Sequence, residues 1–149
     1  METWKPKSFE DHLLYQYWSD LKGQLFLEVP IGNRAFGDWP LRSKIRRIDG
    51  VRLINGIDFE IPKVYSSKDY TLKGFFELCM GKTVELIEVK KNLDRLVIGK
   101  IIAGMDMFER QYQADKIIPV ILCQNGDPAL EWVCEKRNIK VHIIKYTNS

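Results

Sequence analysis

One aspartate and one Glu-x-Lys pair are the residues best placed to do chemistry. Asp49 interrupts an apolar run between Ile48 and Val51, where a charge is unfavourable unless a partner or a metal ion compensates it. Glu88 and Lys90 stand two residues apart at the end of another apolar run, so that in a strand both side chains lie on the same face. We therefore treat Asp49, Glu88 and Lys90 as one candidate site.

Two carboxylates that converge from neighbouring strands form a hard oxygen site suited to Mg²⁺ or Mn²⁺, with substrate phosphate as a further ligand. A lysine beside such a metal can orient or deprotonate the attacking water and offset charge on the phosphorus centre. Each part also has an ordinary interpretation, because Asp49 before Gly50 could begin a turn and Glu-x-Lys pairs occur on exposed strands. The combination, an acid within one strand and an acid-x-lysine ending another, is more specific.

The segments that precede Asp49 are predicted to form a helix and a strand. Ser8 and Asp11 resemble a capping box, and the apolar residues that follow repeat at helical spacing until Gly23. The alternation over Gln24–Ile31 predicts a strand. In this strand the apolar residues expected on one side are Leu25, Leu27, Val29 and Ile31.

Asp49 itself belongs to a predicted strand over Ile45–Leu53. The Asn55-Gly56 pair is a strong turn signal and predicts a hairpin into Ile57–Val64. A short helix is expected around Leu72–Met80.

The second half of the chain alternates between strands and helices. The expected segments are a strand over Thr83–Lys90, a helix over Leu93–Tyr112, a strand over Ile117–Cys123, a helix over Ala129–Arg137 and a strand over Ile139–Ile144. This alternation is typical of an α/β fold, and we expect one domain over residues 1–149 with a central mixed sheet flanked by helices.

The order of these elements resembles a family. Residues 46–52, residues 84–90 and the helix from Leu93 look like the core of the PD-(D/E)XK nucleases, which have the restriction-endonuclease-like fold. The resemblance implies metal ligation by Asp49 and Glu88, an auxiliary metal or water contact by Glu28, and water activation by Lys90. It also implies phosphodiester cleavage of nucleic acid, usually DNA.

The chain departs from this family at three places. The stretch between Asp49 and Glu88 is long, so residues 55–81 are expected to form an insertion or lid. Glu28 falls on a strand, whereas other members often hold their acid on the first helix. Lys100 stands where related families often have glutamine, on the helix face expected to pack on the sheet, so we predict a second active-site cation that pairs with Glu88 or the scissile phosphate.

Basic residues crowd the sequence around the candidate site. The net charge is +3 and the isoelectric point is near 8.7, which is only mildly basic, so composition alone does not require a polyanionic partner. We expect phosphate contacts from Arg42, Lys44, Arg46, Arg47, Arg52 and Lys91. The alternative is an ordinary solvated face.

Trp39 is likewise open to two interpretations, a base-stacking residue or a packed loop anchor.

The bulk properties exclude several classes of protein. No apolar run approaches the roughly 18 residues that span a bilayer, and no secretory leader is apparent, so no membrane partner and a cytoplasmic location are expected. The sequence leaves monomer and homodimer open. It also leaves two alternatives to an active nuclease: a catalytically inactive nuclease-fold module that binds nucleic acid or protein in a repair, phage or defence assembly, and an α/β enzyme acting on a small phosphorylated substrate.

Overall fold

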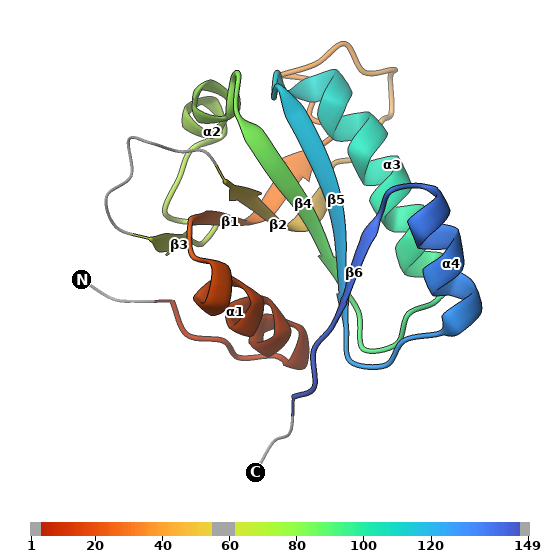
Figure 1. Ribbon diagram of the computed structural model, residues 1–149. Coiled ribbons are helices and arrows are strands. Elements are labelled where there is room, and N and C mark those ends of the chain that lie inside the picture. Colours follow the sequence, from red (N-terminus) through yellow and green to blue (C-terminus); the bar gives the residue numbers. More distant parts are fainter. Residues whose placement is uncertain (1–3, 55–61, 147–149) are drawn as a thin grey trace.

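A six-stranded mixed sheet forms the centre of the protein (Figure 1). The computed structural model describes residues 4–54 and 62–146. The strand order is β3-β1-β2-β4-β5-β6, with antiparallel pairs β1·β2 and β2·β4 and parallel pairs β1·β3, β4·β5 and β5·β6. The strands are β1 (Gln24–Ile31), β2 (Arg46–Leu53), β3 (Lys63–Tyr65), β4 (Thr83–Val89), β5 (Lys116–Cys123) and β6 (Lys140–Ile143). The predicted α/β class with a mixed sheet is confirmed.

Helices cover both faces of the sheet. They are α1 (Phe9–Leu21), α2 (Leu72–Cys79), α3 (Arg95–Gln111) and α4 (Pro128–Lys136). One buried cluster joins the sheet to α1, and the other joins it to α2, α3 and α4. The predicted capping box at Ser8 and Asp11 is confirmed at the start of α1. No helix in the described residues is long and apolar enough to cross a membrane.

Strand β1 changes face at Glu28. Leu25 and Leu27 pack with α1, whereas Val29 and Ile31 belong to the cluster that contains α3. The expectation that these four residues share one side is therefore wrong. The cause is the backbone of Glu28, whose φ of 56° lies in the left-handed region and breaks the two-residue alternation of a strand.

The segment after β2 does not return as a hairpin. The described part of the predicted strand, β3, pairs in parallel with β1 and not with β2, so the hairpin prediction is wrong. Both edges of β2 are already occupied, by β1 and by β4. The Asn55-Gly56 turn and the rest of residues 55–61 lie outside the described residues. The remainder of the predicted 55–81 insertion forms β3 and α2, and α2 packs into the core through Phe75 and Cys79.

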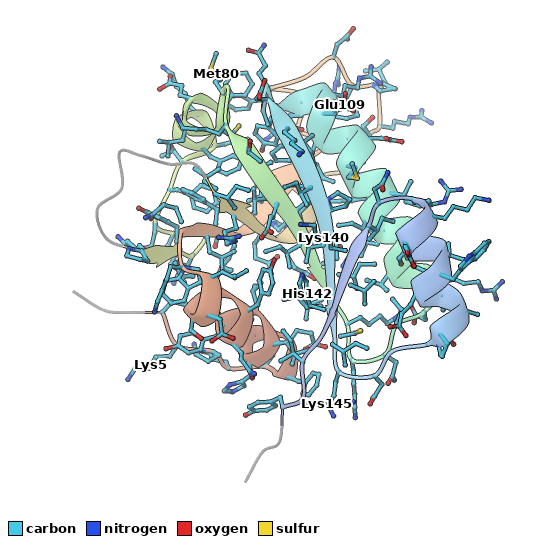
Figure 2. The ribbon with its side chains drawn as sticks, in the orientation of Figure 1. Lys5, Met80, Glu109, Lys140, His142 and Lys145 are labelled. Atoms are coloured by element: carbon cyan, nitrogen blue, oxygen red, sulfur yellow. The ribbon has the colours of Figure 1, made fainter. Side chains whose placement is uncertain are left out.

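Exposed side chains lie at the end of α2 and on the edge strand β6. Met80, at the end of α2, is 46% exposed, and Lys140 is exposed on the edge strand β6 (Figure 2). Glu109 lies near the C-terminal end of α3 in the same view. These surfaces provide positions for control substitutions.

Candidate active site

Strands β2 and β4 separate at the two predicted metal ligands. Their paired register runs from Leu53 opposite Val84 to Gly50 opposite Ile87 and goes no further. Beyond that point β2 stays paired with β1, and β4 stays paired with β5 as far as Val89. Continuing the register places Asp49 opposite Glu88, at the fork between the two halves of the sheet.

Asp49 and Glu88 hold this fork together by reciprocal hydrogen bonds. The backbone N–H of Asp49 donates to Oε1 of Glu88 at 2.9 Å, and the backbone N–H of Val89 donates to Oδ2 of Asp49 at 2.9 Å. Each carboxylate thus satisfies a main-chain donor that the interrupted sheet leaves unpaired. The predicted convergence of the two acids is therefore present, with one oxygen of each engaged by backbone.

The two carboxylates lie in a poorly solvated environment. Burial, and then the nearby charge of Asp49, raise the pKa of Glu88 to about 7, although the Asp49 N–H and Lys100 oppose the shift. Burial also raises the pKa of Asp49, and the carboxylates of Glu10 and Asp11 act in the same direction. Two acids held close together and partly desolvated favour a cation between them.

Lys100 supplies a cation to this fork from α3. Its Nζ lies 3.3 Å from Oε2 of Glu88, so the predicted contact between these two residues is confirmed. Burial lowers the pKa of Lys100, but the charges of Asp49 and Glu88 outweigh it and raise that pKa overall. The ammonium therefore stays protonated beside the carboxylates.

Lys90 is not brought to the two carboxylates. Its Nζ forms an ion pair with Asp94, the N-cap of α3, which also accepts the Val97 N–H. The expectation that Lys90 points into the same cleft as Asp49 and Glu88 is thus wrong for this conformation. The competing carboxylate lies only four residues away, so the local pair forms as the chain turns from β4 into α3.

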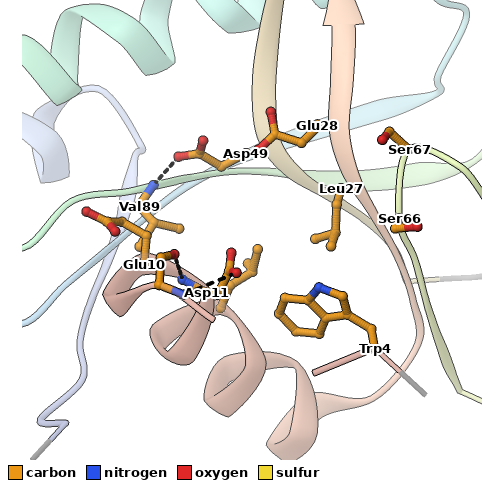
Figure 3. Close-up of a pocket in the computed structure, with 11 residues that line it drawn as sticks. Trp4, Glu10, Asp11, Leu27, Glu28, Asp49, Ser66, Ser67 and Val89 are labelled. Carbon is orange, nitrogen blue, oxygen red and sulfur yellow. Dashed lines mark hydrogen bonds between the residues drawn. The ribbon is translucent and has the colours of Figure 1, made fainter. Parts of the chain in front are cut away.

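A cavity of about 310 Å³ opens on the α1 side of the fork (Figure 3). Its lining comprises Trp4, Ser8, Glu10, Asp11, Leu14, Leu27, Glu28, Asp49, Ser66, Ser67 and Val89. Glu28 and Asp49 fall between the paired residues Leu27–Gly50 and Val29–Ile48 of β1 and β2, and burial and the Asp49 charge raise the pKa of Glu28. Glu28 thus lies beside Asp49 on the adjacent strand, although its side chain is exposed.

Two acids of α1, Glu10 and Asp11, line the same cavity and were missed by the sequence interpretation. Close packing of α1 on β2 brings them there, since a Cβ at Gly50 would lie 3.3 Å from Leu14 of α1. One oxygen of Asp11 is already engaged, because its Oδ2 accepts the backbone N–H of Lys7 and of Ser8. The signal that could have identified Glu10 is the first-helix acid of the resembling family.

Asp49 and Glu88 offer two carboxylates, which is a number of protein ligands that Mg²⁺ commonly takes. Among the described residues no group of three or more histidine, cysteine, aspartate or glutamate side chains is arranged to hold a metal ion. Mg²⁺ commonly takes only one or two carboxylates and completes its shell with water and phosphate. Asp49 and Glu88 would be those two ligands, while the Lys100 ammonium lies against one oxygen of Glu88.

Five of the six predicted phosphate-binding residues are exposed, namely Arg42, Lys44, Arg46, Arg47 and Lys91. Arg52 is different. It is 8% exposed, its Nε donates to Oε1 of Glu85 at 2.8 Å, and its Nη1 donates to the Lys22 carbonyl at 3.0 Å. Assigning Arg52 to a nucleic-acid surface is therefore wrong, because its guanidinium is already engaged on the α1 side of the sheet.

Trp39 is a packed loop anchor. It is 9% exposed, and the guanidinium of Arg110 lies 4.8 Å from its ring centroid. This arrangement leaves no open ring face for an unpaired base, which decides between its two interpretations.

The raised pKa of Glu88 predicts how metal-free protein responds to pH. An unfolded glutamate releases its proton near pH 4.5, whereas folded Glu88 keeps it until about pH 7. Folded protein therefore binds more protons in this window, and its stability should fall as the pH rises from about 4.5 to about 7. The contribution is up to about 3 kcal/mol, since each tenfold change in a protonation constant corresponds to about 1.4 kcal/mol.

Urea unfolding in EDTA at a series of pH values measures this effect. Glu88→Gln should flatten the fall in the free energy of unfolding, and Glu109→Gln, on the exposed part of α3, should not. Parallel curves for wild type and Glu88→Gln would show that Glu88 titrates normally.

Comparison with protein-family models, with curated proteins and with solved structures finds no match for this chain.

Proposed function

We propose that the chain is a metal-dependent nuclease that hydrolyses phosphodiester bonds of nucleic acid, most simply DNA. The observation that carries this proposal is the fork between β2 and β4, where Asp49 and Glu88 meet beside the Lys100 ammonium. A restriction-endonuclease-like arrangement of strands and helix is what the resemblance to PD-(D/E)XK nucleases implies. The chain order α1-β1-β2, then β3 and α2, then β4-α3-β5, with one acid in β2 and one at the end of β4, supports it.

In this proposal Asp49 and Glu88 would hold Mg²⁺ or Mn²⁺, which when bound would lower the pKa of a water and polarise a phosphate oxygen. Lys100 offsets the negative charge that builds on the phosphate as the water oxygen attacks and the P–O bond breaks. Glu28, on β1 next to the β2 residue Asp49, would accept a hydrogen bond from the attacking water. Arg42, Lys44, Arg46, Arg47 and Lys91 hold the flanking phosphates.

A direct assay tests the proposal. Purified chain is incubated with plasmid, single-stranded and branched DNA, and with RNA, in Mg²⁺, Mn²⁺ or EDTA. We expect cleavage that depends on the metal and is absent in EDTA. Intact substrates under all metal conditions would contradict the nuclease proposal.

One observation favours an inactive module that keeps the fold and binds nucleic acid or protein. Lys90 stands where the PD-(D/E)XK nucleases have the lysine that activates water, but it is paired with Asp94 and not with Asp49 or Glu88. Such a module would bind DNA equally well with Ca²⁺ or Mg²⁺ and leave it intact. Cleavage in the assay above removes this alternative.

Lys100→Met tests the second cation. The substitution keeps an aliphatic side chain and removes the charge 3.3 Å from Glu88. We expect cleavage at least about tenfold slower, equivalent to roughly 1.4 kcal/mol of barrier, with an unchanged fold. The matched control is Lys136→Met on α4, which should cleave at the wild-type rate. A wild-type rate for Lys100→Met would leave the lysine with a packing role only.

The exposed basic residues predict a salt-dependent affinity. If Arg46 or Arg47 neutralises a phosphate, its replacement by alanine should reduce the slope of log affinity against log salt by about 0.7–0.9. Binding is measured in Ca²⁺ by fluorescence anisotropy of labelled DNA. Lys140→Ala, on the far edge of the sheet, should leave the slope unchanged. Equal slopes for all three variants would identify an ordinary solvated face.

A further inference from the structure

We propose that the cavity beside Asp49 binds the base of one unpaired nucleotide, so that the enzyme acts on single-stranded or locally unpaired nucleic acid. This inference rests on the proposed function for the place of the phosphate. The cavity itself, its aromatic wall and its acidic lining are independent of that function (Figure 3).

The cavity has the surfaces that a flat ring needs. The Trp4 indole forms one wall, and Leu14, Leu27 and Val89 supply apolar surface around it. Ser66 and Ser67, from the segment after β3, line the cavity on the side away from Glu10 and Asp11. Aromatic side chains bind unpaired bases by stacking, which needs no particular sequence because every base has a π-face.

The size of the cavity matches a single base. Its volume of about 310 Å³ lies at the lower end of the roughly 300–1,000 Å³ typical of small-ligand pockets. A paired base carries its partner strand with it, so a cavity of about 310 Å³ can take a base only when that base is unpaired. Enzymes that act on a base within such a pocket use single strands or extrude the nucleotide from the duplex.

The charge of the lining excludes phosphate from the cavity. Its ionisable residues are Glu10, Asp11, Glu28 and Asp49, all acids, whereas Lys100 lies on the other side of the fork against Glu88. The four acids therefore repel phosphate from the pocket, whereas at the fork Lys100, together with a cation that Asp49 and Glu88 would hold, can accept it. Because Asp49 belongs to both, a nucleotide with its phosphate at the fork can place its uncharged base in the cavity.

The lining also predicts which bases bind best. Ionised carboxylates only accept hydrogen bonds. Adenine and cytosine carry amino groups that donate, whereas the corresponding atom of thymine is a carbonyl oxygen that accepts. We therefore expect oligo(dA) and oligo(dC) to bind more tightly than oligo(dT).

The test uses the full chain in Ca²⁺ with a short single-stranded oligonucleotide that contains 2-aminopurine, and with the same strand in a blunt duplex. Stacking on an indole quenches 2-aminopurine fluorescence. We expect quenching with the single strand, and an affinity at least about tenfold above that for the duplex. Equal affinities, or competition by free dAMP as strong as that by the oligonucleotide, would overturn the proposal.

Two variants change different parts of the cavity lining. Trp4→Ala should remove the quenching and weaken single-strand binding about tenfold, whereas Trp4→Phe should retain both. Trp4 packs at the edge of the α1 cluster, so Trp4→Ala also removes buried surface. Ser67→Trp adds volume at an exposed turn without deleting a contact, and it should block the cavity. The control is Trp132→Ala, since Trp132 is 61% exposed on α4.

The outcomes separate the pocket from the nuclease. Metal-dependent cleavage that ignores strand structure and survives Ser67→Trp would overturn the pocket and leave the nuclease. Single-strand quenching that Trp4→Ala and Ser67→Trp abolish, in a chain that cleaves nothing, would support the pocket and overturn the nuclease.

Discussion

Asp49→Asn and Glu88→Gln should each reduce metal-dependent cleavage by about 10³-fold or more while the protein stays folded. Each amide keeps an oxygen that can accept the backbone N–H now bound at 2.9 Å, so the fork retains its shape. What each variant loses is one negative charge, and with it a hard ligand for the cation and the electrostatic stabilisation of the transition state. Initial rates in saturating Mg²⁺ measure the effect.

Stability provides the second readout for these variants. Like charges held close in a poorly solvated place destabilise the metal-free protein, so both variants should melt at the wild-type temperature or above it in EDTA. In addition, Mg²⁺ should raise the melting temperature of wild type but not of the variants. Lost activity together with lost stability would instead indicate a structural role for the acids.

The control for both is Glu109→Gln. Glu109 is an exposed acid on α3, nine residues beyond Lys100 and therefore roughly 13 Å further along the helix (Figure 2). Its replacement should change neither rate nor stability. Cleavage by Asp49→Asn or Glu88→Gln at the Glu109→Gln rate would remove the proposed site.

Local signals predicted the elements well. The Ser8 and Asp11 capping box, the strand Gln24–Ile31 and the Asp127-Pro128 start of α4 all have the predicted boundaries to within a residue or two. Each depends on hydrogen bonds or side-chain alternation within a few residues. Asp49 and Glu88 could also be chosen from local sequence, because a charged residue within an apolar strand can be recognised without knowing which residues pack against it.

The failures all depend on partners distant in sequence. The left-handed backbone of Glu28 has no local signal, since glutamate ordinarily avoids that region. The hairpin prediction after β2 failed because β4 occupies the edge of β2 that the hairpin needed. Val84 of β4, which pairs with Leu53, comes 31 residues after it in the sequence. Glu10 reaches the cavity only because α1 crosses the sheet near Gly50.

Lys100 makes a contact that the sequence predicts, whereas Lys90 makes one that the sequence does not predict. The Lys100 contact with Glu88 could be predicted, because a lysine early in α3 lies near the end of the strand that carries Glu88. Its expected burial against the sheet is wrong, because the Lys100 side chain is 56% exposed and only its ammonium reaches Glu88. Lys90 had two acids within reach, Glu88 and Asp94, and the sequence does not say which one it binds. In the structure it binds Asp94.

Arg52→Ala should lower the free energy of unfolding by about 3–5 kcal/mol and leave the salt dependence of DNA binding unchanged. Arg52 pairs at 2.8 Å with Glu85, a residue 5% exposed that also accepts the Tyr17 hydroxyl at 3.0 Å. Removing the guanidinium leaves a buried carboxylate without its counter-ion, which costs far more than an exposed ion pair is worth. Urea unfolding at pH 7 measures the loss.

The double variant Arg52→Met with Glu85→Gln identifies the cause. It removes both charges, while the glutamine oxygen can still accept from Tyr17, so most of the lost stability should return. Arg46→Ala is the crossed control, because Arg46 is exposed on the same strand. It should change stability by less than about 0.5 kcal/mol and yet reduce the salt slope of binding. If Arg52→Ala behaved like Arg46→Ala, the basic surface would include Arg52 and the ion pair with Glu85 would open when nucleic acid binds.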